Sequence, residues 1–254
     1  MKPRQGQEKP EASKSHVNSP TMNIYVISYN RAESTIVHKL LEYCTYVVRK
    51  SQEEQYLKLG VDVLAVDDEK INSFAKVNNW LLDNPPCDVA AVLDDDISWF
   101  TYLNMGYDHV TDIVTPTIEI ERMCQLTYDL DVALLGSPVV PIPYKYNEPF
   151  SFSGMVGPLR IYNFKHIKSR YPEIKFFGDT DFVLQELLKN RIILRPNYFV
   201  PKAKLEKNKG GMNITRNKKI QDELAASMKV KWGKYFVFRN KGFLDNVTRI
   251  MVAR

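Results

Sequence analysis

The stretch Asp88-Val89-Ala90-Ala91-Val92-Leu93 leads directly into Asp94-Asp95-Asp96. An apolar run of this length, followed at once by three carboxylates, is typical of a buried parallel strand that ends at a ligand site. Carboxylates so close together repel one another, so the triplet needs a compensating cation. A divalent metal such as Mg2+ or Mn2+ supplies that charge through one or two carboxylates, phosphate oxygens and water. The alternative explanation is a solvated acidic turn.

Strands and helices alternate on the amino-terminal side of this stretch. Predicted strands cover residues 24–28, 46–48, 62–66 and 88–93, and predicted helices cover residues 34–44, 52–59 and 71–82. This alternation predicts an α/β fold with a mostly parallel central sheet and helices on both faces. Ligands are expected beyond the carboxyl ends of its strands.

The carboxyl-terminal half has a less regular pattern. We predict helices over residues 117–130, 164–169, 181–190 and 216–227, a strand over 132–135, an extended loop over 138–149, a strand pair or a strand and a loop over 151–161, and aromatic-rich segments near 235–238. The domain organisation that follows is a disordered tail (1–21), one α/β domain (22–199) and a basic carboxyl-terminal segment (200–254).

Composition excludes several classes of protein. Of the 254 residues, 44% are hydrophobic and 26% are charged, as in ordinary globular chains. No apolar run approaches the roughly 20 residues that span a bilayer, and residues 1–21 lack the apolar core of a secretory signal. We therefore expect a cytoplasmic protein with no membrane partner. The three cysteines and four histidines are scattered, so any metal must be held by carboxylates.

Charge is distributed unevenly along the chain. The net charge is +2 for residues 1–22, −7 for residues 23–199 and +10 for residues 200–254. An acidic body with a basic final fifth predicts a site that handles a metal and a polyanion, whereas an ordinary solvated surface is the alternative.

A second acidic motif, Phe177-Gly178-Asp179-Thr180-Asp181, opens a predicted helix. A helix N-cap accounts for one of its two aspartates. The other is available as a general base, with Asp179 as the first candidate and Asp181 as the second.

These two motifs follow three others along the chain: residues 24–31 with Glu33, Val66-Asp67-Asp68, and a helix with Lys76 and Asn78. The order of the five over residues 23–190 resembles that of the GT-A fold glycosyltransferases. The resemblance implies a single Rossmann-like catalytic domain that transfers a sugar from a nucleotide sugar, a UDP-sugar, to a hydroxyl group with Mn2+ or Mg2+. Metal binding is implied for Asp94 and Asp96, and the base for Asp179 or Asp181, although Gly178-Asp179 stands where the family has Glu-Asp. The residues implied to bind the nucleotide sugar are Ser28, Tyr29, Asn30, Arg31, Asp67, Lys76, Asp94 and Asp95.

The basic segment is similar to that of the phage-type TET/JBP-associated glycosyltransferases, which implies 5-hydroxymethylpyrimidine in DNA as the acceptor. The residues implied for an acceptor site or lid are Lys207, Lys209, Gly210, Gly211, Asn213 and Trp232. Basic residues neutralise phosphates, and Trp232 is suited to stack on an extruded base, although the aromatic residues near 235–238 also fit a terminal strand. The alternatives are a saccharide or protein acceptor, a nucleotidyltransferase, or a nucleic-acid-binding module without activity.

Overall fold

A computed structural model describes residues 19–140, 142–143, 148–203, 218–239 and 247–252. Most of the predicted tail, residues 1–18, lies outside this part. Thr21 already belongs to the folded body, because its backbone N–H and its hydroxyl both donate to the Asp88 carboxylate, at 2.8 and 2.7 Å.

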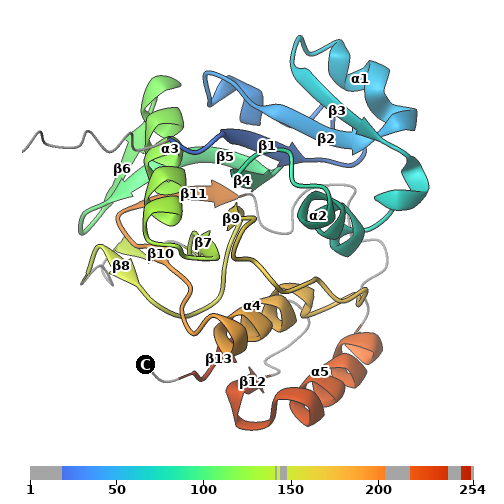
Figure 1. Ribbon diagram of the computed structural model, residues 1–254, viewed down its shortest axis with the longest axis vertical. Helices are drawn as coiled ribbons and strands as arrows, with labels where there is room; N and C mark the ends of the chain where they lie inside the picture. The colour runs from blue at the N-terminus through green and yellow to red at the C-terminus, as the bar shows by residue number, and fades with distance from the viewer. Residues whose placement is uncertain (1–18, 141, 144–147, 204–217, 240–246, 253–254) are drawn as a thin grey trace, which may run out of the picture.

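Six strands form the central sheet in the order β3-β2-β1-β4-β9-β7 (Figure 1). They are β1 (Met22–Ile27), β2 (Thr45–Arg49), β3 (Asp62–Val66), β4 (Val89–Asp94), β7 (Leu134–Gly136) and β9 (Leu159–Asn163). β1 to β4 are parallel, and β9 runs antiparallel to both β4 and β7. The chain proceeds from β1 to β2 and β3 on one side and then crosses to β4 on the other. The strand order therefore reverses between β1 and β4, which is where open α/β sheets bind ligands.

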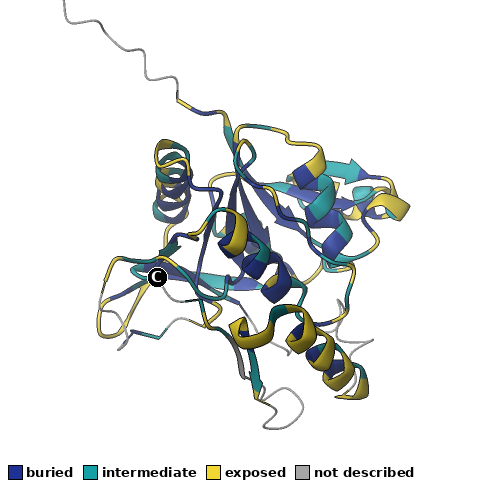
Figure 2. Cartoon of the chain, turned by 60° about the horizontal axis from the view of Figure 1, so that its bottom comes forward, coloured by how far each residue is buried: buried dark blue, intermediate teal, exposed yellow. Residues whose placement is uncertain are grey.

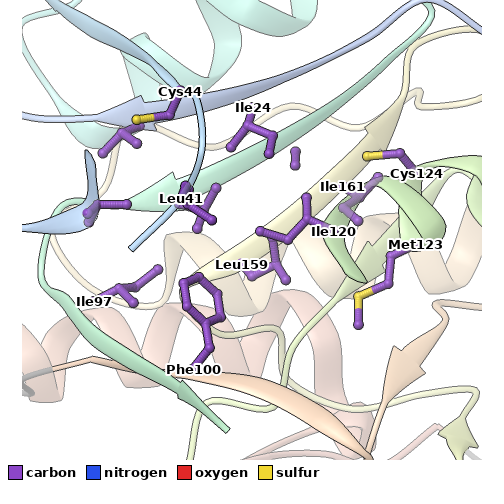
Figure 3. Packing of buried hydrophobic residues seen from close by; sticks show 14 of the residues in the cluster. Ile24, Leu41, Cys44, Ile97, Phe100, Ile120, Met123, Cys124, Leu159 and Ile161 are labelled. Carbon is purple, nitrogen blue, oxygen red and sulfur yellow. The ribbon is translucent and has the colours of Figure 1, made fainter. Parts of the chain in front are cut away.

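Helices cover both faces of this sheet, as predicted (Figures 1 and 2). The α-helices are α1 (Glu53–Leu57), α2 (Phe74–Asp83), α3 (Val114–Asp129), α4 (Gly178–Lys189) and α5 (Lys218–Trp232). Ile24 of β1 faces a core that it shares with Ile120 and Met123 of α3 (Figure 3). The next residue, Tyr25, faces the opposite core, which includes Leu81 of α2 and residues of α4. This alternation is the period-two pattern of a strand buried on both sides.

A smaller sheet, which is not among the predicted elements, follows the three aspartates directly. It has the order β11-β5-β6, formed by β11 (Phe199–Ala203), β5 (Ile97–Leu103) and β6 (Tyr107–Val110). Two short pairs complete the strands: β8 (Phe150–Ser151) with β10 (Arg195–Pro196), and β12 (Phe236–Arg239) with β13 (Val247–Ile250). Because β11 pairs with β5, the main fold extends past the predicted domain boundary at residue 200.

Two predicted helices are wrong. Residues 34–44 contain only the 3-10 turn η1 (Val37–Lys39), because the run Thr35-Ile36-Val37 is β-branched and disfavours a helix. Residues 164–166 form a turn and residues 167–169 are irregular, because the backbone N–H groups of Lys168 and Ser169 donate to the buried Glu186 carboxylate of α4. The other 3-10 turns are η2 (Lys50–Gln52), η3 (Asp68–Lys70) and η6 (Gly233–Tyr235).

The helices of the described residues are too short or too polar to cross a membrane.

Candidate active site

The three aspartates at the end of β4 have different partners. Asp94 accepts a hydrogen bond from Nη2 of Arg160 on β9, at 2.5 Å. Asp95 is buried and accepts from Nη1 of Arg31, at 2.6 Å. Asp96 is 20% exposed, and the same Arg31 nitrogen lies 3.8 Å from its Oδ2. The three carboxylates therefore have three different environments.

Ser28 connects the ends of β1 and β4, the two strands between which the order reverses. Its hydroxyl donates to Asp95 at 2.5 Å and lies 2.6 Å from the phenolic oxygen of Tyr56. The same Tyr56 oxygen accepts from the backbone N–H of Arg31 at 3.2 Å. Ser28 and Arg31, both predicted site residues, thus meet the aspartates at the expected edge of the sheet.

Burial and mutual repulsion raise the pKa of two of these carboxyls. Burial raises the pKa of Asp95, and the Arg31 charge and hydrogen bonds oppose that rise. For Asp96, burial and the charges of Asp94 and Asp95 raise the pKa to about 6, with Arg31 opposing. Asp96 is thus a carboxylate with too little positive charge around it, and a bound cation would relieve this deficit.

The residues fit a divalent metal held largely by its substrate. Within the described part of the chain, no three His, Cys, Asp or Glu side chains converge on one point that could hold an ion. Mg2+ and Mn2+ do not require such a cage, since one or two carboxylates with phosphate oxygens and water suffice. Asp96 is the available ligand, whereas Asp94 shares its charge with Arg160.

Arg160 is a site residue that the sequence motifs did not identify. It is buried, its Nη1 donates to the carbonyl of Gly157 at 3.3 Å, and its guanidinium lies 5.4 Å from the ring centre of Phe74. Burial alone would lower the pKa of Arg160, but the Asp94 charge and hydrogen bond raise it. The signal in the sequence is an arginine inside the apolar strand Leu159-Arg160-Ile161, which requires a buried anion as partner.

The loop after β1 presents one aromatic ring at the surface. Tyr29 is 40% exposed, and the guanidinium of Arg49 lies 3.7 Å from its ring centre. The carbonyl of Asn72 accepts from Nη2 of Arg49 at 2.8 Å, which fixes this stack. Asn30 has a left-handed backbone, φ 55°, and both its backbone N–H and its side chain bond to Gln52, so it shapes the loop.

Two further residues that were predicted to bind the nucleotide sugar pair with side chains outside the aspartate cluster. Asp67 is exposed and pairs with Lys70 at 3.0 Å, and the hydrogen bond from Lys70 lowers the pKa of Asp67. It follows β3, at the same edge of the sheet as Asp94. Lys76 of α2 lies 3.8 Å from Glu173.

Asp179 stands exposed in the first turn of α4. Its charge acts on Tyr162 and Tyr171, whose hydroxyls lie 2.7 Å apart. Burial raises the pKa of Tyr162 to about 12, with Arg160 opposing the rise and Asp179 adding to it. The charges of Asp179, Arg160 and Asp94 therefore all act on the Tyr162 hydroxyl.

Asp181 is buried, and both of its oxygens are occupied. Oδ2 accepts from Nζ of Lys231 at 2.7 Å and from Nε1 of Trp232 at 2.9 Å, and Oδ1 accepts from Gln185 at 2.6 Å. These hydrogen bonds attach α5 to α4. Both oxygens of Asp181, the second candidate base, are thus occupied by hydrogen bonds, and the Trp232 indole N–H, predicted for an acceptor site or lid, donates to this carboxylate. Phe236 packs in the same place, because it is buried against α4 and α5.

The remaining predicted acceptor or lid residues, Lys207, Lys209, Gly210, Gly211 and Asn213, lie outside the described residues.

The fold class is thus a GT-A type α/β domain. Its carboxylate cluster lies where the strand order of the central sheet reverses. No protein-family model and no curated protein matches the chain. Among solved structures, glucosyl-3-phosphoglycerate synthase from Mycobacterium tuberculosis, in complex with Mn2+ and UDP-glucose, aligns with a TM-score of 0.51 at 10% identity, covering 91% of this chain and 86% of that chain. Mannosyltransferase PcManGT from Pyrobaculum calidifontis, in complex with GDP-Man and Mn2+, aligns with a TM-score of 0.50 at 13% identity, covering 76% of this chain and 59% of that chain.

At such low identity these likenesses establish the fold, and the predicted fold class is confirmed.

Proposed function

We propose that the protein is a metal-dependent glycosyltransferase that moves a sugar from a nucleotide-sugar donor, a UDP-sugar, to a hydroxyl group. One observation carries this proposal: Ser28, Arg31, Asp95 and Asp96 come together where the sheet order reverses, in a GT-A type fold. Both similar enzymes named above were solved with a nucleotide sugar and Mn2+.

Asp96 is the proposed protein ligand of Mn2+ or Mg2+. When bound, the ion neutralises the negative charge that develops on the departing diphosphate. Asp94 flanks this position, and Arg160 fixes its orientation through the 2.5 Å hydrogen bond. Arg31 holds Asp95 in place and lies close enough to Asp96 to limit its repulsion in the absence of metal.

The donor base is proposed to lie along the exposed ring of Tyr29. The Arg49 guanidinium stacked on that ring and the Gln52 contacts of Asn30 keep the loop in one conformation. A rigid aromatic surface binds a flat heterocycle with little loss of side-chain entropy. Asp67 lies further along the same edge, in reach of the ribose or base in this arrangement.

Asp179 is the proposed general base. The acceptor hydroxyl gives its proton to the Asp179 carboxylate, its oxygen forms the new bond to the anomeric carbon, and the bond from that carbon to the diphosphate oxygen breaks. A positioned general base contributes about 10^2 to 10^4 in rate. The exposure of Asp179 at the start of α4 favours it over the buried Asp181.

The proposed acceptor is 5-hydroxymethylpyrimidine in DNA. It is supported by the +10 charge of residues 200–254 and by the exposed lysines of α5, Lys218, Lys219 and Lys229. Lysines bind phosphates by releasing condensed counterions, which makes binding steeply dependent on salt. A neutral saccharide acceptor would not need such a surface.

The direct test incubates the protein with Mn2+, a panel of UDP-sugars and DNA that contains hydroxymethyluracil or hydroxymethylcytosine, followed by mass analysis of the nucleosides. A hexose adduct on the modified base is the expected result. UDP release without any adduct, together with transfer to a free saccharide, would retain the glycosyltransferase and reject the DNA acceptor. Absence of UDP release from every donor would reject the enzyme.

A salt titration tests the acceptor separately. We expect the double variant Lys218→Ala/Lys219→Ala to flatten the log–log salt dependence of DNA binding by up to about 0.9 for each phosphate that is no longer neutralised. The matched control Lys39→Ala/Lys58→Ala removes two exposed lysines from the amino-terminal half. Equal slopes for wild type and both variants would contradict DNA binding at α5.

A further inference from the structure

Arg195 is a half-buried cation that has no carboxylate partner among the described residues. It lies on β10, and its Nη1 donates to the carbonyl of Ser153, at 3.0 Å. Its Nε is buried and has no hydrogen-bond partner in the part of the chain that the structure describes. Burial lowers the pKa of Arg195, with no compensating contribution from a carboxylate.

The buried Nε atoms of Arg31 and Arg160 also lack a hydrogen-bond partner among the described groups, but each of these two arginines has a carboxylate partner. Arg31 lies 2.6 Å from Asp95, and Arg160 lies 2.5 Å from Asp94. Across the described ranges, no carboxylate oxygen comes within 4.0 Å of a nitrogen of Arg195. A buried N–H of a cation is costly to leave without an acceptor, so an anion from outside the described residues is the natural partner.

The surroundings of Arg195 offer a second donor. Ser151 of β8 is the register partner of Arg195, and directly opposed residues of an antiparallel pair place their side chains on the same face. The Ser151 hydroxyl is also buried and has no partner among the described groups. One oxyanion between the two strands would accept from both groups.

Gly154 makes room for this arginine. Its φ is +123°, a conformation that other residues rarely adopt, and a Cβ atom there would overlap Nη1 of Arg195. The guanidinium therefore packs against the backbone of Gly154, where no side chain can cover its N–H groups.

Arg195 lies at the same edge of the sheet as the aspartates. β7 is parallel to β4 because both pair antiparallel with β9, so the two strands end at one edge. Leu194 bridges Leu135 of β7 in parallel, so Arg195, the next residue, follows it toward that edge. Three strand spacings separate this position from β4, about 14 Å. This distance suits the acceptor side of the site better than the donor diphosphate beside Asp96.

We infer that Arg195 and Ser151 bind a phosphate group of the acceptor. The inference rests on the proposed glycosyl transfer and specifies its substrate class: an acceptor that carries a phosphate in addition to the hydroxyl that is glycosylated. The guanidinium fork binds phosphate through charge-assisted hydrogen bonds, and Ser151 donates one more. In the proposed DNA acceptor this group is a backbone phosphodiester, and in a small acceptor it is a phosphomonoester.

Thermal unfolding in inorganic phosphate, compared with sodium chloride of equal ionic strength, tests the anion site. We expect phosphate to raise the Tm of the wild type beyond the chloride control, and to lose that effect in Arg195→Met and weaken it in Ser151→Ala. The charge-matched control Arg239→Met, on the exposed end of β12, should keep the full effect. An equal phosphate effect in wild type and Arg195→Met, or no effect in wild type, would overturn the inference, because water would then satisfy these donors.

Acceptor kinetics separate the two sources of the phosphate. With hydroxymethyldeoxyuridine, its 5′-monophosphate and a hydroxymethyluracil oligonucleotide as acceptors, Arg195→Met should raise KM about tenfold or more for whichever phosphorylated acceptor is the substrate, and leave the nucleoside unchanged. Mn2+-dependent UDP binding, measured in the same variant, should equal that of wild type. If UDP binding is absent in wild type while the phosphate effect persists, the proposed function fails and the anion site stands. If UDP binds and the phosphate effect is absent, the anion site fails alone.

Discussion

Replacing Asp96 by asparagine should stabilise the metal-free protein at neutral pH while it removes metal-dependent donor binding. The ordinary pKa of an aspartate is 3.8, and burial together with Asp94 and Asp95 raises that of Asp96 to about 6. Each pKa unit corresponds to about 1.4 kcal/mol, so the ionised carboxylate costs the fold about 3 kcal/mol above pH 6. Asparagine has nearly the same shape and no charge, so it avoids this cost.

The sign of the pH dependence follows from proton binding. Between pH 4 and 6 the folded state holds the Asp96 proton more tightly than the unfolded state does, so stability contributed by this group is fully present below about pH 4. It is lost as the pH rises through about 6. The Asp96→Asn variant should therefore exceed wild type in Tm by about 6 to 12 °C at about pH 7.5, and the two should converge near pH 4.

Differential scanning calorimetry at the two pH values measures this gap, and calorimetric titration of UDP with and without Mn2+ measures the functional loss. Asp67→Asn is the matched control, because Asp67 is exposed and its pKa is lowered by Lys70, so no gain in Tm is expected. A wild-type Tm equal to that of Asp96→Asn at the higher pH would show that the charge is already compensated. UDP affinity that still depends on Mn2+ in the variant would refute Asp96 as the metal ligand.

Three further substitutions test the rest of the site. Asp179→Asn should leave UDP affinity unchanged and lower kcat about 10^2- to 10^4-fold, since asparagine keeps the shape of the side chain but cannot accept the proton; steady-state kinetics would contradict this role if kcat stayed within a few-fold of wild type. Asp181→Ala should lower the free energy of unfolding by about 3 kcal/mol, because Lys231 and Trp232 of α5 lose the carboxylate to which they donate. Urea denaturation measures the loss, and an unchanged midpoint would show that these hydrogen bonds do not hold α5 to α4. Arg160→Met should destabilise by a similar amount and weaken Mn2+-dependent UDP binding, and a double-mutant cycle with Asp94→Asn should give strong coupling between the two residues; additive effects would separate them.

Local sequence was enough for the four parallel strands β1 to β4 of the central sheet. The apolar runs that form β1, β2, β3 and β4 are packed on both faces, so their hydrophobicity alone marks them. β5 was missed because it starts directly after Asp96 and mixes fully and partly buried positions, which a search for continuous apolar runs does not detect. Residues 34–44 were misassigned because their apolar spacing is helical while their β-branched residues oppose a helix.

The sequence also did not predict the partners of single acidic side chains. The sequence identified Asp94, Asp95 and Asp96 as a group. In the structure Asp94 pairs with Arg160, Asp95 pairs closely with Arg31, and Asp96 lies farther from the same Arg31 nitrogen. These partners lie 64 to 66 residues away along the chain, so no local pattern assigns them.

The sequence by itself therefore determined the alternation of strands and helices, the position of the carboxylates at a strand end, and the excess of positive charge in the last fifth of the chain. Each of these depends on the order of residue types within a few positions. Tertiary structure alone decided that Asp181 and Trp232 are an anchor, that Arg160 neutralises Asp94, and that Arg195 has no carboxylate partner among the described residues. The energy of a charged group depends on its burial and on the charges around it, and both are set by residues that meet only when the chain has folded.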